Sequence, residues 1–132
     1  MLLVRSEKMR KFKDNSKIIK CLKVISDLNN LDFEVVNTTF EDINTVSNKL
    51  KKAVIIIGIV GGNTYNAIFC PEDCTVIEIV PTQNTDSNIN FLSYAGIRFI
   101  PFPLEFNHSD EVVDVPTDKL AALVAKVLSK GN

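Results

Sequence analysis

The stretch that decides the fold is Ala53-Val54-Ile55-Ile56-Ile57-Gly58-Ile59-Val60-Gly61-Gly62-Asn63-Thr64-Tyr65-Asn66. Its first half is a continuous apolar run, mostly β-branched, which is typical of a strand buried on both faces of a parallel sheet. Its second half turns on Gly58, Gly61 and Gly62, where the backbone can bend sharply or approach a ligand. We expect Asn63 or Thr64 to cap a short helix through residues 67–69. The stretch alone is equally consistent with a phosphate site at a helix N-terminus and with a plain strand-to-helix turn.

Length and composition predict one soluble globular domain. The chain has 132 residues, of which 45% are hydrophobic and 23% charged, and its formal net charge is −1. The charge is unevenly distributed, because residues 1–24 contain eight basic residues against Glu7 and Asp14, a local net charge of +6. Such a segment fits an anionic ligand or a merely solvated face, and we predict no nucleic-acid partner.

Three cysteines and one histidine limit the metal and disulfide chemistry. Cys21 lies on the apolar side of a predicted helix and is expected in the core. Cys70 and Cys74 flank Pro71-Glu72-Asp73, so they could close a small disulfide loop in an oxidising compartment. A Cys/His zinc site is not expected with a single histidine. No apolar run is long enough to span a membrane, and we expect Met1-Leu2-Leu3-Val4, followed by Arg5, to be too short for a signal peptide.

Hydrophobic periodicity predicts alternating strands and helices. The expected strands are residues 2–4, 33–36, 53–58, 74–80 and 97–100, with Pro101 and Pro103 ending the last one. The expected helices are residues 16–28, a second one starting at the capping box of residues 39–42, the short helix after the glycine turn, residues 88–95, and a final helix capped by Thr117. Residues 104–115 are expected to form an acidic loop.

This order predicts an α/β three-layer, Rossmann-like domain covering residues 1–132, with a mainly parallel five-stranded sheet. Right-handed crossovers favour the strand order 2-1-3-4-5, with a switch point between the first and third strands. The basic loop expected at residues 5–15 and the glycine turn would then meet at the carboxyl ends of adjacent strands, overlooked by Glu78. The predicted binding residues are Arg5, Arg10, Gly61, Gly62, Asn63, Thr64, Asn66 and Glu78.

The order of basic loop, glycine turn and carboxylate resembles the donor-binding half of the glycosyltransferase 61 (GT61) family. Leu3-Val4-Arg5 and Arg10-Lys11-Phe12 look like the family's strand ending in arginine and its following basic run, with Asp14 where an asparagine is usual. Residues 53–66 are similar to the family's apolar-Gly-x-His-Gly-Ala segment and its later asparagine. Phe69 and Thr75-Val76-Ile77-Glu78-Ile79, followed by Pro81, match the family's next strand. Val60, however, occupies the place of the family's histidine, and Gly62 that of its alanine.

The resemblance implies the C-terminal, nucleotide-sugar-binding domain of an inverting GT-B glycosyltransferase with a UDP-linked donor as substrate and no other cofactor. No Asp-x-Asp motif occurs, so metal independence is expected, and the catalytic residues are left unassigned. The chain is too short to contain an acceptor-binding half as well, so the resemblance implies a missing domain or a partner chain. If the chain is part of a longer protein, that protein could lie in the lumen of the secretory pathway. The alternative is a noncatalytic nucleotide-binding or assembly module that keeps the fold. Receiver and flavodoxin-like domains share the topology, but the first loop is neither acidic nor rich in hydroxyl groups.

Overall fold

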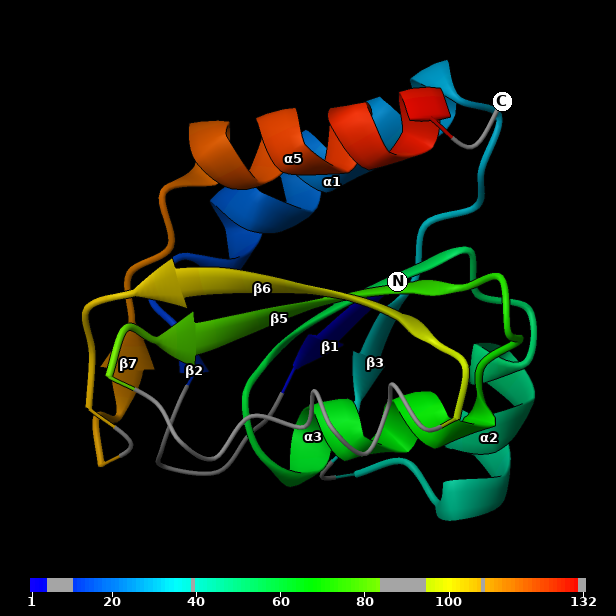
Figure 1. Ribbon diagram of the computed structural model, residues 1–132, viewed down its shortest axis with the longest axis horizontal. Coiled ribbons are helices and arrows are strands. Elements are labelled where there is room, and N and C mark those ends of the chain that lie inside the picture. Colours follow the sequence, from blue (N-terminus) through cyan, green and yellow to red (C-terminus); the bar gives the residue numbers. More distant parts are fainter. Residues whose placement is uncertain (5–10, 39, 84–94, 108, 131–132) are drawn as a thin grey trace.

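A computed structural model shows three layers, with a parallel sheet between two layers of helices (Figure 1). It describes residues 1–4, 11–38, 40–83, 95–107 and 109–130, and the helix expected at residues 88–95 therefore lies almost wholly outside the described residues. Helices α1 (Asn15–Leu28) and α5 (Thr117–Lys130) cover one face of the sheet. Helix α2 (Ile43–Leu50), the short helix α3 (Gly62–Tyr65) and the 3-10 helix η1 (Asn66–Phe69) cover the other. The α/β prediction is confirmed.

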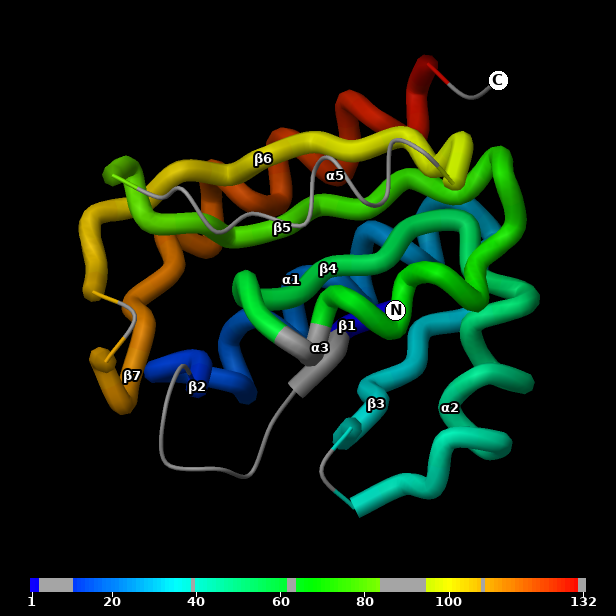
Figure 2. The backbone as a smooth tube through the Cα atoms, turned by 60° about the horizontal axis from the view of Figure 1, so that its bottom comes forward, coloured from blue at the N-terminus to red at the C-terminus, as the bar shows by residue number. Residues whose placement is uncertain are grey.

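The five predicted strands form the larger sheet. They are β1 (Leu2–Val4), β3 (Val35–Asn37), β4 (Ile55–Ile59), β5 (Thr75–Pro81) and β6 (Arg98–Leu104), in the parallel order β3-β1-β4-β5-β6. Counted along the chain within this sheet, that is 2-1-3-4-5. Two further strands lie outside this sheet, however. A separate parallel pair joins β2 (Lys11–Phe12) to β7 (Val112–Val113), two segments that were predicted to be loops (Figure 2).

Strand β6 continues through both prolines to Leu104, so the prediction that they end it is wrong. Thr82 N–H donates to Leu104 O at 2.9 Å, which shows that the backbone groups of Leu104 face β5. Because these groups alternate along a parallel strand, those of Pro101 and Pro103 face away from β5. No ladder hydrogen bond to β5 is lost, and an edge strand tolerates proline at such positions.

The core lies on both faces of β4 and β5, whose residues are all buried. Ile55, Ile57 and Ile59 pack into a cluster with residues of α1 and α5, whereas Ile56 packs into a second cluster with residues of α2. This alternation follows from the two-residue period of a strand. Burying each isoleucine contributes about 1.5–3 kcal/mol to stability, so the central strands are a rigid base for the loops at their ends.

Aspartates start the two helices that follow the first two sheet strands. The Asp14 carboxylate accepts from Lys17 N–H at 3.0 Å, and α1 begins at Asn15. The Asp42 carboxylate accepts from Thr45 N–H at 2.9 Å, so α2 begins after Asp42 and not at the capping box predicted for residues 39–42. Glu41 is occupied elsewhere: its carboxylate accepts from Asn37 N–H at 2.8 Å and pairs with Lys49.

Candidate functional site

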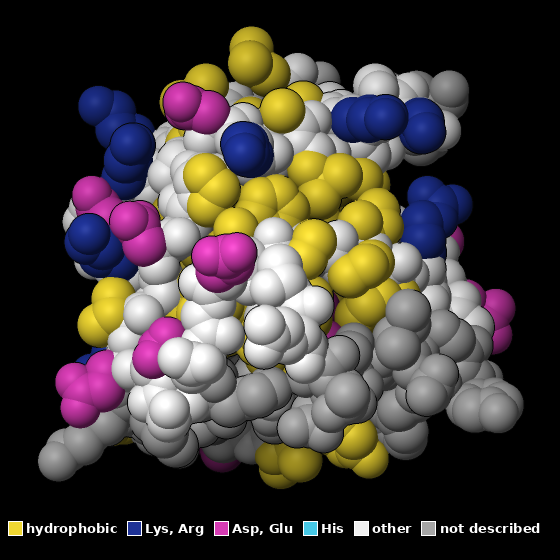
Figure 3. All heavy atoms as spheres, turned by 60° about the vertical axis from the view of Figure 1, so that its left-hand side comes forward, with side chains coloured by type: hydrophobic (Ala, Val, Ile, Leu, Met, Phe, Trp, Pro, Cys, Tyr) yellow, Lys and Arg dark blue, Asp and Glu magenta, His cyan; other side chains and the backbone are white. Residues whose placement is uncertain are grey.

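The carboxyl ends of the parallel strands lie at one edge of the large sheet, as predicted. Strand β1 ends at Val4, β4 at Ile59 and β5 at Pro81, and the glycine turn follows β4 at this edge. Arg5 and Arg10, which supply the positive charge of the predicted site, lie outside the described residues. Figure 3 shows this side of the molecule, where hydrophobic side chains are open to the surface below the α1–α5 layer and carboxylates gather beside them.

The glycine turn leaves the sheet directly after Val60. Val60 N–H donates to Ile79 O at 2.9 Å, which continues the β4–β5 ladder by one residue. Gly61 follows with φ = 131°, a backbone conformation that residues with a Cβ rarely adopt. A glycine is therefore required at position 61 for α3 to begin at Gly62 and fold back over the sheet.

Asn63 and Thr64 lie inside α3 and not at its N-cap, so that prediction is wrong. Helix α3 spans four residues and continues as η1 from Asn66, which is half-buried. A helix this short carries little aligned dipole, because the macrodipole is a sum over peptide units. Any phosphate site here therefore depends on backbone N–H groups of the glycine turn rather than on a long helix.

Among the predicted binding residues that the structure describes, Glu78 differs most from its predicted position. It lies in the middle of β5 and is fully buried, so its carboxylate neither overlooks the edge of the sheet nor faces water. Thr64 is also fully buried, and its hydroxyl donates to the Glu78 carboxylate. The Thr64 hydroxyl also lies 3.2 Å from Gly61 O, so it connects the turn, α3 and β5.

Strand parity explains why these two side chains meet. Glu78 shares a face of β5 with Val76, which belongs to the cluster on the α2 side of the sheet. In the β4–β5 register Glu78 lies opposite Gly58, which has no side chain to fill the space between them. The carboxylate is thus accommodated under α3. The two-residue spacing of Val76 and Glu78 was the one signal in the sequence, because it places both side chains on the same face of the strand. It could not predict that Thr64, 14 residues earlier, is the hydrogen-bond partner of Glu78.

The described cavities do not coincide with the glycine turn. The larger, of about 670 Å³, lies at the opposite edge of the sheet, where Met1 and Val54 meet Leu22, Val124 and Lys49. A smaller cavity, of about 260 Å³, lies between the first turns of α1 and α5 and is lined by Lys13, Asp14, Lys17, Ile18, Asp114, Val115 and Thr117. Its lysines are balanced by carboxylates, and Lys13 pairs with Asp114 at 3.5 Å. Neither cavity was predicted.

Within the described residues, no group of three or more His, Cys, Asp or Glu side chains is arranged to hold a metal ion. In the same part of the chain, none of the helices combines the length and hydropathy needed to cross a bilayer.

Comparison with protein families identifies the chain. The model of the family "Glycosyltransferase 61" matches residues 2–77, more than half of the 132 residues. The chain belongs to the glycosyltransferase 61 family. The matched segment starts with β1 and ends at Ile77 in β5, so it contains the glycine turn and stops one residue before Glu78. The family predicted from the motifs is confirmed.

Solved structures show that this glycosyltransferase 61 domain has a flavodoxin-like fold. A diflavin flavoprotein A3 from Nostoc sp. superposes with a TM-score of 0.59 at 13% identity, covering 98% of this chain and 90% of that chain. A flavodoxin-like domain from Synechococcus sp. gives a TM-score of 0.58 at 9% identity, covering 99% of this chain and 97% of that one. At such identities the likeness concerns the fold alone. The comparison with curated proteins gives no match.

Proposed function

We propose that this glycosyltransferase 61 domain binds a nucleotide sugar, with a UDP-linked donor, at the carboxyl edge of its sheet. The observation that carries the proposal is the extent of the family match. Residues 2–77 include β1, β4 and the glycine turn, and ligands of open α/β sheets bind at the carboxyl edge where these strands end. Strand β6 and the part of β5 after Ile77 lie outside the match.

Each part of this edge has a proposed role. Arg5 and Arg10 neutralise the diphosphate, and the backbone N–H groups of Gly61, Gly62 and Asn63 donate to its oxygens. Thr64 and Asn66 hold the turn in place, and Glu78 accepts from a ribose hydroxyl. That last contact requires the Glu78 carboxylate to rearrange, because its bond with Thr64 is buried under α3.

As part of an enzyme, the domain serves transfer with inversion at the anomeric carbon. The acceptor hydroxyl loses its proton to a base, and its oxygen forms a bond to the anomeric carbon as the bond to the diphosphate breaks. The leaving group departs with both electrons of the broken bond. Cations and backbone donors already placed around the diphosphate stabilise the negative charge that develops there.

The second candidate, a noncatalytic nucleotide-binding or assembly module, is favoured by one observation. Val60, in the place of the family's histidine, is 1% exposed and packs in the cluster on the α1–α5 side. The valine side chain can neither donate a hydrogen bond nor move a proton, so it cannot take the part of a histidine side chain. Both candidates bind a nucleotide, and they differ in turnover.

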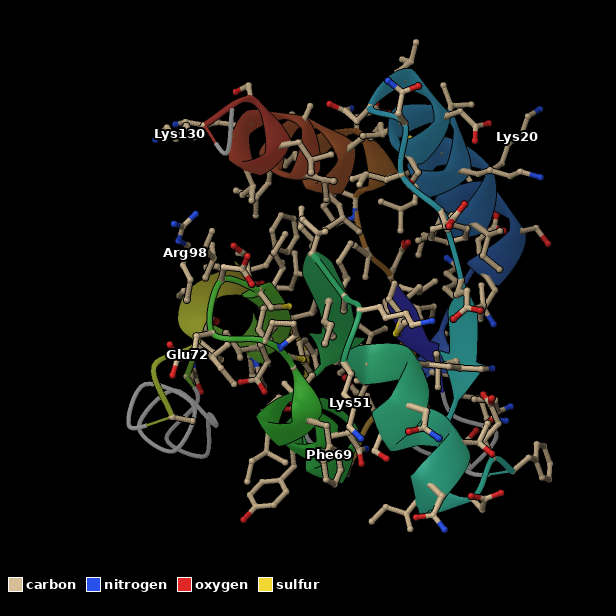
Figure 4. All side chains as sticks on the ribbon, turned by 90° about the vertical axis from the view of Figure 1, so that its right-hand side faces the viewer. Lys20, Lys51, Phe69, Glu72, Arg98 and Lys130 are labelled. Carbon is tan, nitrogen blue, oxygen red and sulfur yellow. The ribbon has the colours of Figure 1, made fainter. Side chains whose placement is uncertain are left out.

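Calorimetry with UDP at low salt tests the binding proposal. We expect binding that is weakened at least tenfold by Arg5→Ala or Arg10→Ala, since each change removes a charged contact to phosphate. Lys20→Ala is the matched control, because it removes an equal charge from the exposed surface of α1, away from the proposed site (Figure 4). Folded protein that binds no UDP at millimolar concentration would exclude the nucleotide site.

A glycine pair provides a second comparison. Gly61→Ala should weaken UDP binding because it strains the turn, whereas Gly96→Ala should leave binding unchanged. Gly96 also has a positive φ, of 77°, and among the described residues no atom lies within 4 Å of the position that an added Cβ would take. Equal effects of the two substitutions on UDP binding would show that the glycine turn is not part of the binding site.

A further inference from the structure

Two long helices begin side by side at the smaller cavity. Strands β2 and β7 pair in parallel, and each leads into a helix, β2 into α1 and β7 into α5. Both helices have 14 residues and run in the same direction over one face of the sheet (Figure 1). The cavity of about 260 Å³ is lined by residues at the start of both. The positive ends of two helix dipoles therefore lie at the same small space.

Thr117 is a buried polar residue in the wall of this cavity. It is the first residue of α5, so it is not the N-cap that the sequence predicted. It is only 8% exposed, and its hydroxyl forms no hydrogen bond with any described residue. Buried polar side chains are nearly always hydrogen-bonded, and an exception calls for an explanation such as a bound water or ion. The Thr117 hydroxyl is thus available to a ligand in the cavity.

Backbone donors accompany this hydroxyl. Leu120 N–H donates to Pro116 O at 3.1 Å and is the first N–H group of α5 with a helical partner. The N–H groups of residues 117–119 have no acceptor among the described residues, as is general for the first turn of a helix without a side-chain cap. Such groups bind anions readily, because the helix dipole favours negative charge at the same place.

The charged side chains of the cavity also favour an anion, although two lysines and two aspartates line it. Asp14 already accepts from Lys17 N–H at 3.0 Å as the cap of α1. Lys13 pairs with Asp114 at 3.5 Å, but these side chains are 64% and 76% exposed, and such exposed pairs are weak. The Lys17 ammonium pairs with no carboxylate of the described residues. It can therefore neutralise a ligand.

We propose that this cavity binds a phosphate group. The N–H groups at the start of α5 and the Thr117 hydroxyl donate to the phosphate oxygens, and the Lys17 ammonium balances their charge. The cavity volume of about 260 Å³ is below the roughly 300–1,000 Å³ of pockets that enclose drug-sized ligands, so a whole nucleotide is too large for it. The ligand is therefore inorganic phosphate or the phosphate end of a small molecule.

This phosphate site is separate from the proposed nucleotide site. Helices α1 and α5 cover one face of the sheet, whereas α3, which follows the glycine turn, lies on the other face (Figure 1). The inference therefore does not depend on nucleotide binding. Inorganic phosphate should bind with the same affinity whether or not UDP is present at saturating concentration.

Calorimetry with inorganic phosphate, near neutral pH and in a buffer without other oxyanions, tests the site. We expect saturable binding that Lys17→Ala weakens roughly tenfold, because it removes the charged contact. Thr117→Val, which keeps the shape of the side chain, should weaken binding roughly fivefold, whereas Thr117→Ser, which keeps a hydroxyl, should bind like the unmodified chain. Lys20→Ala is the matched control, since it removes an equal charge from α1 outside the cavity.

Asp114→Asn tests the sign of the ligand's charge. The substitution removes a carboxylate from the wall and releases Lys13 from its ion pair, so phosphate should bind more tightly. A titration followed by NMR gives the location. The amide resonances of residues 117–119 should shift with phosphate but not with chloride at the same ionic strength.

Thermal melting identifies the variants that remain folded, and only these are compared. Folded, unmodified chain that shows no saturable binding of phosphate would overturn the proposal. Equal effects of Lys17→Ala and Lys20→Ala, or weaker binding by Asp114→Asn, would overturn it as well. Displacement of phosphate by UDP would assign the phosphate to the nucleotide and contradict a separate site. Loss of UDP binding with phosphate binding intact would instead contradict the nucleotide proposal alone.

Discussion

At the residue scale, the decisive contact is the buried hydrogen bond from Thr64 to Glu78. Because the Glu78 carboxylate is enclosed, its two possible roles are distinguished by which ligands bind more weakly when it is replaced. A ribose contact affects only ligands that contain ribose. A contact that merely positions the glycine turn affects every ligand bound to that turn.

Glu78→Gln is predicted to weaken UDP more than inorganic pyrophosphate. Loss of a charged hydrogen bond to the ribose should cost about 1.5–3 kcal/mol of binding free energy. Calorimetry with both ligands measures the difference. Thr64→Val is the matched control, since it removes the hydroxyl but keeps the shape of the side chain. If both variants weaken both ligands equally, Glu78 is a positioning residue and the predicted ribose contact is wrong.

The same control variant carries a stability prediction. Thr64→Val leaves the Glu78 carboxylate buried without this donor, and a buried polar group that loses its partner costs about 1–3 kcal/mol. Urea unfolding of Thr64→Val should therefore show a lower midpoint than that of the unmodified chain. An unchanged midpoint would show that the hydroxyl contributes nothing net to the fold.

At the element scale, Asp42 determines where α2 begins. The backbone N–H and the hydroxyl of Thr45 both donate to its carboxylate and hold its pKa below the ordinary value of 3.8. A carboxyl whose pKa is lower in the folded state stabilises the fold above the unfolded pKa and loses that contribution as pH falls through the folded pKa. Helix α2 should therefore weaken only in acid.

Asp42→Asn tests this pH dependence. An asparagine can still cap a helix but does not titrate. The stability difference between the unmodified chain and Asp42→Asn should be constant above about pH 5 and shrink as the pH falls below 3.8. Urea unfolding at several pH values measures it. A difference that stays the same down to about pH 2 would show that the charge of Asp42 does not contribute to the cap.

At the scale of the whole molecule, the chain forms three α/β layers, and its resemblance to the glycosyltransferase 61 family implies a GT-B enzyme in which transfer takes place between two such domains. We predict that the 132-residue chain alone transfers no sugar from a UDP-linked donor. If a missing domain is the only deficiency, supplying it in trans or as a fusion should restore turnover. If Val60 is also disabling, turnover should require Val60→His together with that domain.

The buried position of Val60 adds a cost to that experiment. An imidazole placed at a site that is 1% exposed and surrounded by apolar residues destabilises the fold unless it finds a partner. Thermal melting must therefore show that the variant is folded before its activity is measured. Sugar transfer by the purified, unmodified chain would contradict both the single-domain prediction and the noncatalytic alternative.

The sequence by itself determined the alternation of strands and helices, the membership in the glycosyltransferase 61 family and the edge of the sheet that carries the glycine turn. These follow from local periodicity and from residues close together in the chain. The passage of β6 through Pro101 and Pro103 was decided only by its place at the edge of the sheet. The β2–β7 pair joins segments about 100 residues apart, and the Thr64–Glu78 bond depends on which faces of α3 and β5 meet. Such pairings are set by packing between distant segments, and a linear pattern does not contain that information.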